Sequence, residues 1–293
     1  MNVLTGLPRC EALTISPTAA QLASWTQIYV PEFDVFYLKD RFDFENMSEV
    51  VLYSAAEFFG DPKYQDIELN NAFEYWKRSK DVQYVMIAPP HWFGRLPETQ
   101  KRMLNQQQVE LNRGLVFPLP LGELTFGEEY VASGHVVLCN ELWAAIDRDQ
   151  FLLAVAKEWD DGICLEMPAD TPEHLRDFAD SYPDKSGGNC LGAAIFALCG
   201  DAEIANVWLH QEPFLAALRD NNYHEIPDDS HSGGDVVVGY DKNRKIQHAA
   251  YCVTTDCYFN KDGQSFFNPW KLVSRETLET EWPSLTWKTW RCH

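Results

Sequence analysis

The sequence predicts a protein of the α+β class, on two observations. SGGNCLGAAIFALCG (186–200) begins with a glycine-rich turn and continues as a helix that is apolar on every side, which is typical of a buried helix. Residues 233–269 then form β-rich runs separated by polar turns. A buried helix followed by consecutive strands favours a helix packed on an antiparallel sheet.

The residues before this region predict a mixed, mostly helical N-terminal part. Ser48 is a helix-cap candidate, and apolar spacings of three and four after it predict a helix over 48–60. Residues 82–90 predict a buried strand ended by two prolines, and 135–146 begin like a strand and end like a helix. Further helices are predicted over 67–80, 96–114, 148–162, 171–182 and 203–226.

These segments place a domain boundary between residues 125 and 165. We therefore divide the chain into a mixed α/β region of unknown role (1–150) and a C-terminal domain (151–293). With 293 residues, the chain is long enough for two domains.

The chain is acidic throughout, with 21 acidic and 12 basic residues in 1–150 and 23 acidic and 12 basic in 151–293. This balance argues against nucleic acid or an anionic membrane as partner, because both attract basic surfaces. No leader-like start and no uninterrupted apolar run of membrane-spanning length is visible, so we expect a cytoplasmic protein, with leaderless secretion left open. Composition determines neither the substrate nor the oligomeric state.

Eight cysteines are spread along the chain, and no Cys-x-x-Cys pair or His/Cys spacing typical of zinc occurs. We therefore expect no metal and no cofactor. Most of these thiols are expected to be small buried side chains.

Cys190 has surroundings that indicate chemistry. It begins the predicted buried helix, and free N–H groups at a helix N-terminus favour a thiolate. Gly187 and Gly188 allow a tight turn and are expected to leave room for a substrate. The backbone N–H of Cys190 is a candidate oxyanion donor, and the side chain of Asn189 is a second candidate.

A base and an orienting group are expected on the strands that follow. His248 lies in IQHAAYCV among small and apolar residues, and Asn260 follows 12 residues later, after a turn that brings the two side by side. Asp256 and Asp262 are alternatives for the third residue. The plainer alternatives are a core histidine and a core thiol.

Four segments together resemble the NlpC-type cysteine peptidases, a branch of the papain-like superfamily. They are GGNCLGAAI (187–195), GGDVVVGY (233–240), QHAAYCV (247–253) and YFNKDGQ (258–264). The resemblance implies a papain-like core with Cys190 as nucleophile, His248 as base and Asn260 as orienting residue. Tyr182 is the nearest counterpart of the family's upstream tyrosine. Asn189 stands where the family usually has Asp.

The function expected on this basis is thiol-dependent hydrolysis of an amide or peptide bond. The resemblance implies cell-wall-derived peptides as substrates. One alternative is a glutamine deamidase or acyltransferase of the toxin or effector type, with residues 1–150 as a recognition module. The other is an inactive binding module of the same fold.

Overall fold

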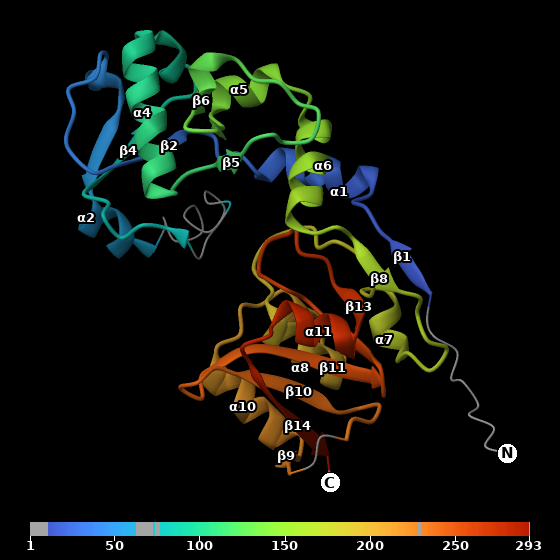
Figure 1. Cartoon of the computed structure of the whole chain (residues 1–293). Coiled ribbons are helices and arrows are strands. Elements are labelled where there is room, and N and C mark those ends of the chain that lie inside the picture. The colour runs from blue at the N-terminus through green and yellow to red at the C-terminus, as the bar shows by residue number, and fades with distance from the viewer. Residues whose placement is uncertain (1–10, 63–72, 74–76, 228–229, 293) are drawn as a thin grey trace, which may run out of the picture. The chain divides into compact units, whose positions relative to one another are not determined.

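The computed structural model describes residues 11–62, 73, 77–227 and 230–292, and it has mixed helices and antiparallel sheets, as the α+β prediction requires (Figure 1). The chain divides into two compact units. One contains residues 22–155, and the other combines the residues up to Gln21 with those from Ala156 onward. The sequence places a division at residue 150 and does not indicate that residues 11–21 belong with the C-terminal unit.

The unit of residues 22–155 contains two three-stranded antiparallel sheets, in the orders β2-β4-β3 and β5-β7-β6. The strands are β2 (Asp34–Leu38), β3 (Val51–Ser54), β4 (Tyr84–Ala88), β5 (Val116–Pro118), β6 (Val131–Ala132) and β7 (His135–Val137). The helices lying wholly or mostly in this unit are α1 (Ala19–Ile28), α2 (Ala55–Gly60), α4 (Glu98–Leu111), α5 (Asn140–Ala145) and α6 (Arg148–Trp159).

Helix α4 is polar because it closes the edge of a sheet. Strand β2 is an edge strand, and the Gln108 amide accepts a hydrogen bond from Tyr37 N and donates one to Tyr37 O, each at 2.8 Å. Gln107 accepts another from Lys39 N. These side chains pair backbone groups that an exposed edge would leave open.

The predicted helix over 48–60 is wrong in its first half. Residues Val51–Ser54 form strand β3 against β4, and only Ala55–Gly60 form an α-helix. The cap is Ser54 rather than Ser48, in a capping box with Glu57. The predicted helix over 67–80 lies largely outside the described residues.

The C-terminal unit is built on a six-stranded antiparallel sheet in the order β13-β12-β11-β10-β14-β9. Its strands are β9 (Tyr223–Ile226), β10 (Val236–Tyr240), β11 (Ile246–Thr254), β12 (Cys257–Asn260), β13 (Lys271–Ser274) and β14 (Thr286–Cys292). Its helices are α7 (Glu173–Arg176), α8 (Cys190–Cys199), α9 (Ala202–Ala205), α10 (Gln211–Asp220) and α11 (Arg275–Glu281). Strands β1 (Ala12–Thr14) and β8 (Ile163–Leu165) pair separately.

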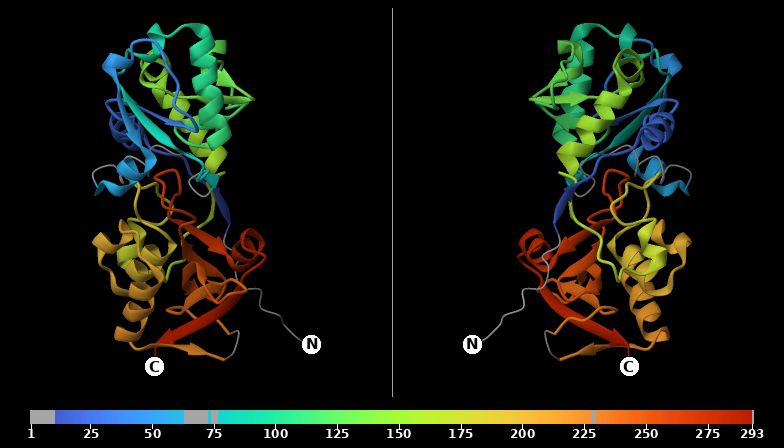
Figure 2. Two further views of the ribbon diagram at one scale, coloured as in Figure 1. Left: turned by 90° about the vertical axis from the view of Figure 1, so that its left-hand side faces the viewer. Right: turned by 90° about the vertical axis from the view of Figure 1, so that its right-hand side faces the viewer.

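The two faces of this sheet are covered by different helices (Figure 2). Helix α8 packs on β11 and β12, and α10 packs on α8. Alternate strand residues face this side: Val236, Val238, Ala249, Tyr251, Phe259 and Leu272. Their neighbours form a second cluster with Leu278 of α11: Val237, Ala250, Cys252, Tyr258 and Val273. The period of two thus determines which side chains meet the buried helix.

Three C-terminal elements differ from the sequence prediction. Residues 171–182 contain only the short helix α7, and 264–268, which resemble a strand in sequence, form bends and turns. The 203–226 segment ends in strand β9 after its two helices. The aromatic C-terminus is strand β14, which pairs with the central strand β10.

A buried ion pair joins the start of β10 to β14. Asp235 is 2% exposed and accepts two hydrogen bonds from the Arg291 guanidinium, at 2.8 and 2.7 Å. A bidentate pair of this kind fixes geometry as well as charge. Asp235, which follows the two glycines of GGDVVVGY (233–240), is therefore held in place by its pairing with Arg291.

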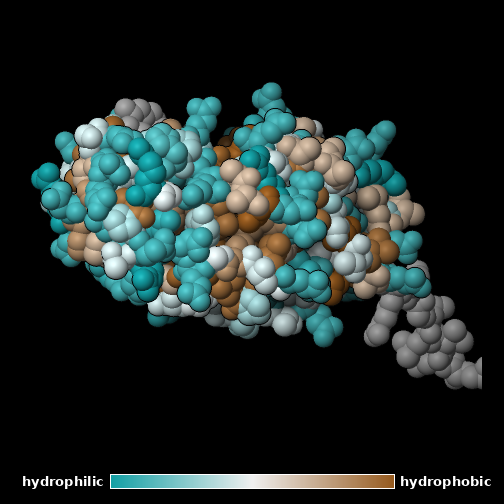
Figure 3. Space-filling view, turned by 90° about the horizontal axis from the view of Figure 1, so that it is seen from above, coloured by the Kyte–Doolittle hydropathy of each residue, from teal (hydrophilic) through white to brown (hydrophobic). Residues whose placement is uncertain are grey.

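One face of the molecule carries a hydrophobic area among hydrophilic side chains. In Figure 3, hydrophobic groups gather near the middle of the visible face and hydrophilic side chains surround them. Within the described residues, no helix combines the length and apolar character that crossing a membrane requires.

Phe196 is the side chain whose loss should most directly loosen α8. It is fully buried, and its ring centroid lies 4.4 Å from that of Phe178 and 6.0 Å from that of Phe259. We expect Phe196→Ala to lower the free energy of unfolding by about 3–5 kcal/mol, because it leaves a cavity. Urea unfolding measures this loss. The exposed Val207→Ala is the control, and equal losses in the two variants would contradict the assigned packing.

Candidate active site

Cys190 is the first residue of α8, and Asn189 caps that helix. The Asn189 Oδ1 atom accepts hydrogen bonds from Gly192 N at 3.0 Å and Leu209 N at 3.2 Å, while its Nδ2 donates to Leu209 O at 2.9 Å. These contacts give the Asn189 amide a capping role, and its predicted oxyanion role stays a prediction. The Cys190 N–H lies in the first turn, where helix N–H groups have no intrahelical acceptor.

The glycines around Cys190 do not leave the substrate space that the sequence predicts. A Cβ atom on Gly188 would lie 2.0 Å from Ala205 O, and one on Gly192 would lie 2.6 Å from Val207 O. The space is therefore filled by the chain's own backbone at the end of α9 and just beyond it, and it is not room for a substrate. Gly187 additionally has a φ of +138°, which favours glycine.

The loop that follows Asn260 ties down the turn that precedes Cys190. Gly187 N donates to Gln264 O at 2.8 Å, and Phe266 N donates to Ser186 Oγ at 3.2 Å. The loop is itself held by Lys261, which is 1% exposed and donates from Nζ to Ser265 O and Asn268 O. The strand carrying Asn260 and the helix carrying Cys190 are thus joined by local hydrogen bonds.

His248 and Asn260 lie in contact on neighbouring strands. Tyr251 pairs with Phe259, so Asn260 and His248 are diagonal neighbours on the same side of the sheet. His248 Nε2 lies 2.6 Å from Asn260 Oδ1, and both residues are buried. The structure therefore brings together the two residues that the sequence pairs.

Two tryptophans enclose the His248 ring. Trp282 stacks on it with centroids 4.8 Å apart, and Trp287 contacts it edge-on at 6.1 Å. Gly239 pairs with both His248 and Trp287, and a Cβ there would lie 3.2 Å from the Trp287 ring. The missing side chain lets the indole reach the imidazole. Sequence reasoning missed both tryptophans, because their contacts come from distant segments.

The Cys190 side chain lies close enough to His248 to affect the pKa of its ring. Burial alone would lower the pKa of His248. The Cys190 side chain, followed by Asp262 and Asn260, outweighs burial and raises that pKa to about 9. Because Nε2 is engaged by Asn260, Nδ1 is the ring nitrogen left for the sulfur. Cys190 is partly exposed, whereas His248 and Asn260 are buried.

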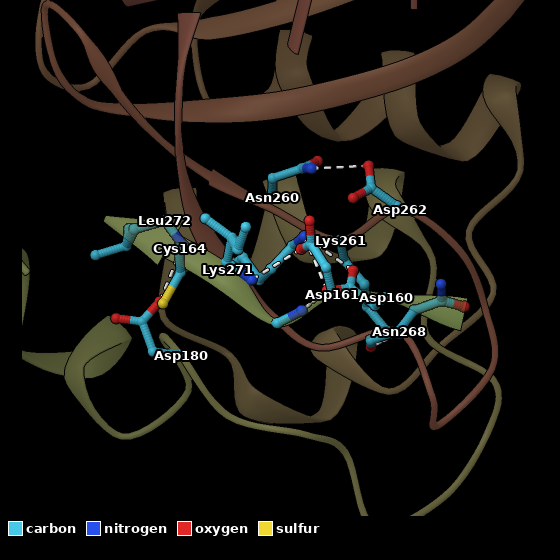
Figure 4. A network of polar contacts seen from close by, with 12 residues as sticks. Asp160, Asp161, Cys164, Asp180, Asn260, Lys261, Asp262, Asn268, Lys271 and Leu272 are labelled. Atoms are coloured by element: carbon cyan, nitrogen blue, oxygen red, sulfur yellow. Dashed lines mark hydrogen bonds and ion pairs between the residues drawn. The ribbon is translucent and has the colours of Figure 1, made fainter. Parts of the chain in front are cut away.

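A pocket of about 410 Å³ lies beside this group. Asp262, which bonds to Asn260, and Trp282, which stacks on His248, both line it. Its other lining residues are Lys157, Glu158, Trp159, Asp160, Asp161, Asn268, Lys271 and Glu281. Figure 4 shows the polar network formed here, including the contact between Asn260 and Asp262.

Burial alters the charge behaviour of two residues near this pocket. It lowers the pKa of Lys261 to about 7, against the opposing effects of Asp262, Cys190 and Asp160. It raises the pKa of Glu281 to about 7, with further raising by Asp262.

The remaining candidates lie apart or have other partners. Asp256 is in the turn between β11 and β12, away from the Asn260 end of β12. Tyr182 is buried, and burial followed by the charges of Asp160 and Asp161 raises its pKa. Its carbonyl accepts a hydrogen bond from Gln21. A substrate-binding role for Tyr182 stays a prediction.

The chain was compared with protein-family models, characterised proteins and solved structures, and none of the three comparisons gives a match. Within the described residues, no group of three or more His, Cys, Asp or Glu side chains is arranged to hold a metal ion.

The close backbone approach at Gly188 predicts a stability effect. We expect Gly188→Ala to lower the free energy of unfolding by more than about 1 kcal/mol, because the new Cβ must displace the Ala205 carbonyl. Gly60→Ala is the matched control, since nothing lies within 4 Å of that Cβ position. Equal unfolding midpoints for the two variants in urea would rule out the described packing.

Proposed function

We propose that this chain is a cysteine hydrolase that cleaves amide or peptide bonds. The observation that carries the proposal is the buried His248 between Cys190, at the start of a helix, and Asn260, on the next strand. A thiol is activated when a base lies beside it and a third group orients that base.

The proposed reaction begins with the Cys190 thiolate and the His248 imidazolium. The sulfur attacks the carbonyl carbon, and the backbone N–H of Cys190 stabilises the oxyanion that forms. His248 gives its proton to the leaving amine as the C–N bond breaks, which leaves a thioester. His248 then takes a proton from water, the hydroxide cleaves the thioester, and the acid product leaves with the thiolate restored.

A papain-like core is also part of the proposal. Two features support this arrangement. Helix α8 begins with Cys190 and packs on an antiparallel sheet, and the chain of that sheet carries first His248 and then Asn260. The resemblance to NlpC-type peptidases supports peptides derived from the cell wall as substrates. Short muropeptides are therefore the first substrates to test, with a new free amine as the readout.

Thiol labelling tests the assigned nucleophile. We expect iodoacetamide to label Cys190 at pH 7 at least about tenfold faster than the exposed Cys199, because thiolate is the reactive form. His248→Ala should abolish this difference. Peptide mapping by mass spectrometry measures both sites in one sample. Equal labelling of Cys190 and Cys199 in the unmodified chain would favour the inactive binding module.

The pH dependence of hydrolysis follows from His248. Because its pKa is raised to about 9, the ring holds its proton below that pH and loses it above. The leaving amine needs that proton, so kcat/KM for amide cleavage should fall as pH rises through about 9. Initial rates across pH measure this limb. A rate that keeps rising beyond pH 10 would contradict His248 as the acid.

A further inference from the structure

The far side of Asn260 carries a group that the proposed reaction does not use. Asn260 Nδ2 donates to Asp262 Oδ1 at 2.8 Å, as Figure 4 shows, and the same oxygen lies 3.8 Å from His248 Nε2. Asn260 is fully buried, whereas the Asp262 side chain is 21% exposed. Asp262 therefore lies at the edge of the pocket with one oxygen directed to the buried amide.

The chemistry of these partners fixes a direction along the chain of hydrogen bonds. A carboxylate only accepts hydrogen bonds, so the NH₂ end of the Asn260 amide must face Asp262. The carbonyl end then faces His248, and an amide carbonyl only accepts. His248 Nε2 must therefore carry a proton, which in the neutral ring leaves Nδ1 without one.

We infer that Asp262 is a positioning residue that selects the Nε2–H form of His248 by orienting Asn260, and so leaves Nδ1 to exchange a proton with Cys190. The consequence for catalysis rests on the proposed function. The inference itself concerns only which nitrogen of the His248 ring carries the proton. Asp262 also places a negative charge near the imidazolium, which supports the same proton.

Other charged groups surround Asp262 and His248. Lys261 and Lys271 interact favourably with Asp262, and Asp160 and Glu281 unfavourably. Lys271 is paired with Asp160 at 2.9 Å. The group facing His248 from α8 is Cys190, and Glu281 faces it from α11. Removing one distant charge from the pocket is therefore the necessary control for removing Asp262.

The test is nuclear magnetic resonance of the full chain with ¹⁵N-labelled histidine. In the unmodified chain above the titration of His248, the neutral ring should carry its proton on Nε2. In Asp262→Asn the Asn260 amide can turn either way, so the Nδ1–H form should appear. The pKa of His248 should also fall by about one unit, because an opposite charge is lost. Glu158→Gln removes a charge from the same pocket and should change neither property.

Two further variants keep the inference testable if Asp262→Asn folds poorly. Asp262→Glu retains the carboxylate and should retain the Nε2–H form. Asn260→Ala removes the link, so the Nδ1–H form should appear there too. An unchanged tautomer and titration in Asp262→Asn, or an unchanged tautomer in Asn260→Ala, would overturn the inference.

Cys190 labelling connects the ring to function. We expect Asp262→Asn to slow iodoacetamide labelling at pH 7 by at least about tenfold, because a less stable His248 imidazolium supports less of the reactive thiolate. A tautomer shift in a chain that cleaves no amide would support the positioning role and refute the hydrolase. Labelling in Asp262→Asn as fast as in Glu158→Gln would contradict the coupling of Asp262 to the sulfur.

Discussion

The contact between Cys190 and His248 depends on how helix α8 is seated against the sheet. The helix is apolar on every side and is buried from Leu191 to Ala197, and its first residue is placed where β11 carries the imidazole. Cys190 itself contributes little to this packing. The position of the thiol is therefore a consequence of the whole hydrophobic cluster, with Phe196 at its centre.

The His248 ring is surrounded by side chains in place of water. Trp282 covers the ring of His248, Asn260 engages Nε2, and the 261–268 loop holds the turn before Cys190. A charged imidazole that is 1% exposed is costly unless it is paired, and here the Cys190 and Asp262 side chains raise the pKa of His248 against the effect of burial. Asn260 and Asp262 therefore both favour the buried His248 ring and determine which of its nitrogens carries the proton.

Local patterns made part of this predictable from sequence. The start of α8 is indicated by a glycine turn followed by an apolar run, and the β11–β12 hairpin by a polar turn between β-rich residues. The His248–Asn260 pair follows from that hairpin, because strand pairing converts a separation of 12 residues into a contact. These predictions rest on neighbours in sequence, where propensity and period are informative.

The remaining features depend on distant segments. Trp282 and Trp287 meet His248 only because α11 and β14 return to the sheet, and neither element has a clear sequence signal. Residues 51–54 have helical spacing but pair with β4, so tertiary contact overrides the pattern. Gly188 appears in sequence as space for a substrate, whereas a carbonyl from residue 205 fills that space.

The central claim of the proposed function is that His248 activates Cys190 as the nucleophile. Ultraviolet thiolate absorbance, taken as the difference between the chain and Cys190→Ser across pH, measures this directly. The account predicts a Cys190 thiolate signal already present at pH 7 that is lost in a His248→Ala background. A Cys190 signal that appears only near pH 8.5, where an ordinary thiol ionises, and that is the same without His248, would contradict it.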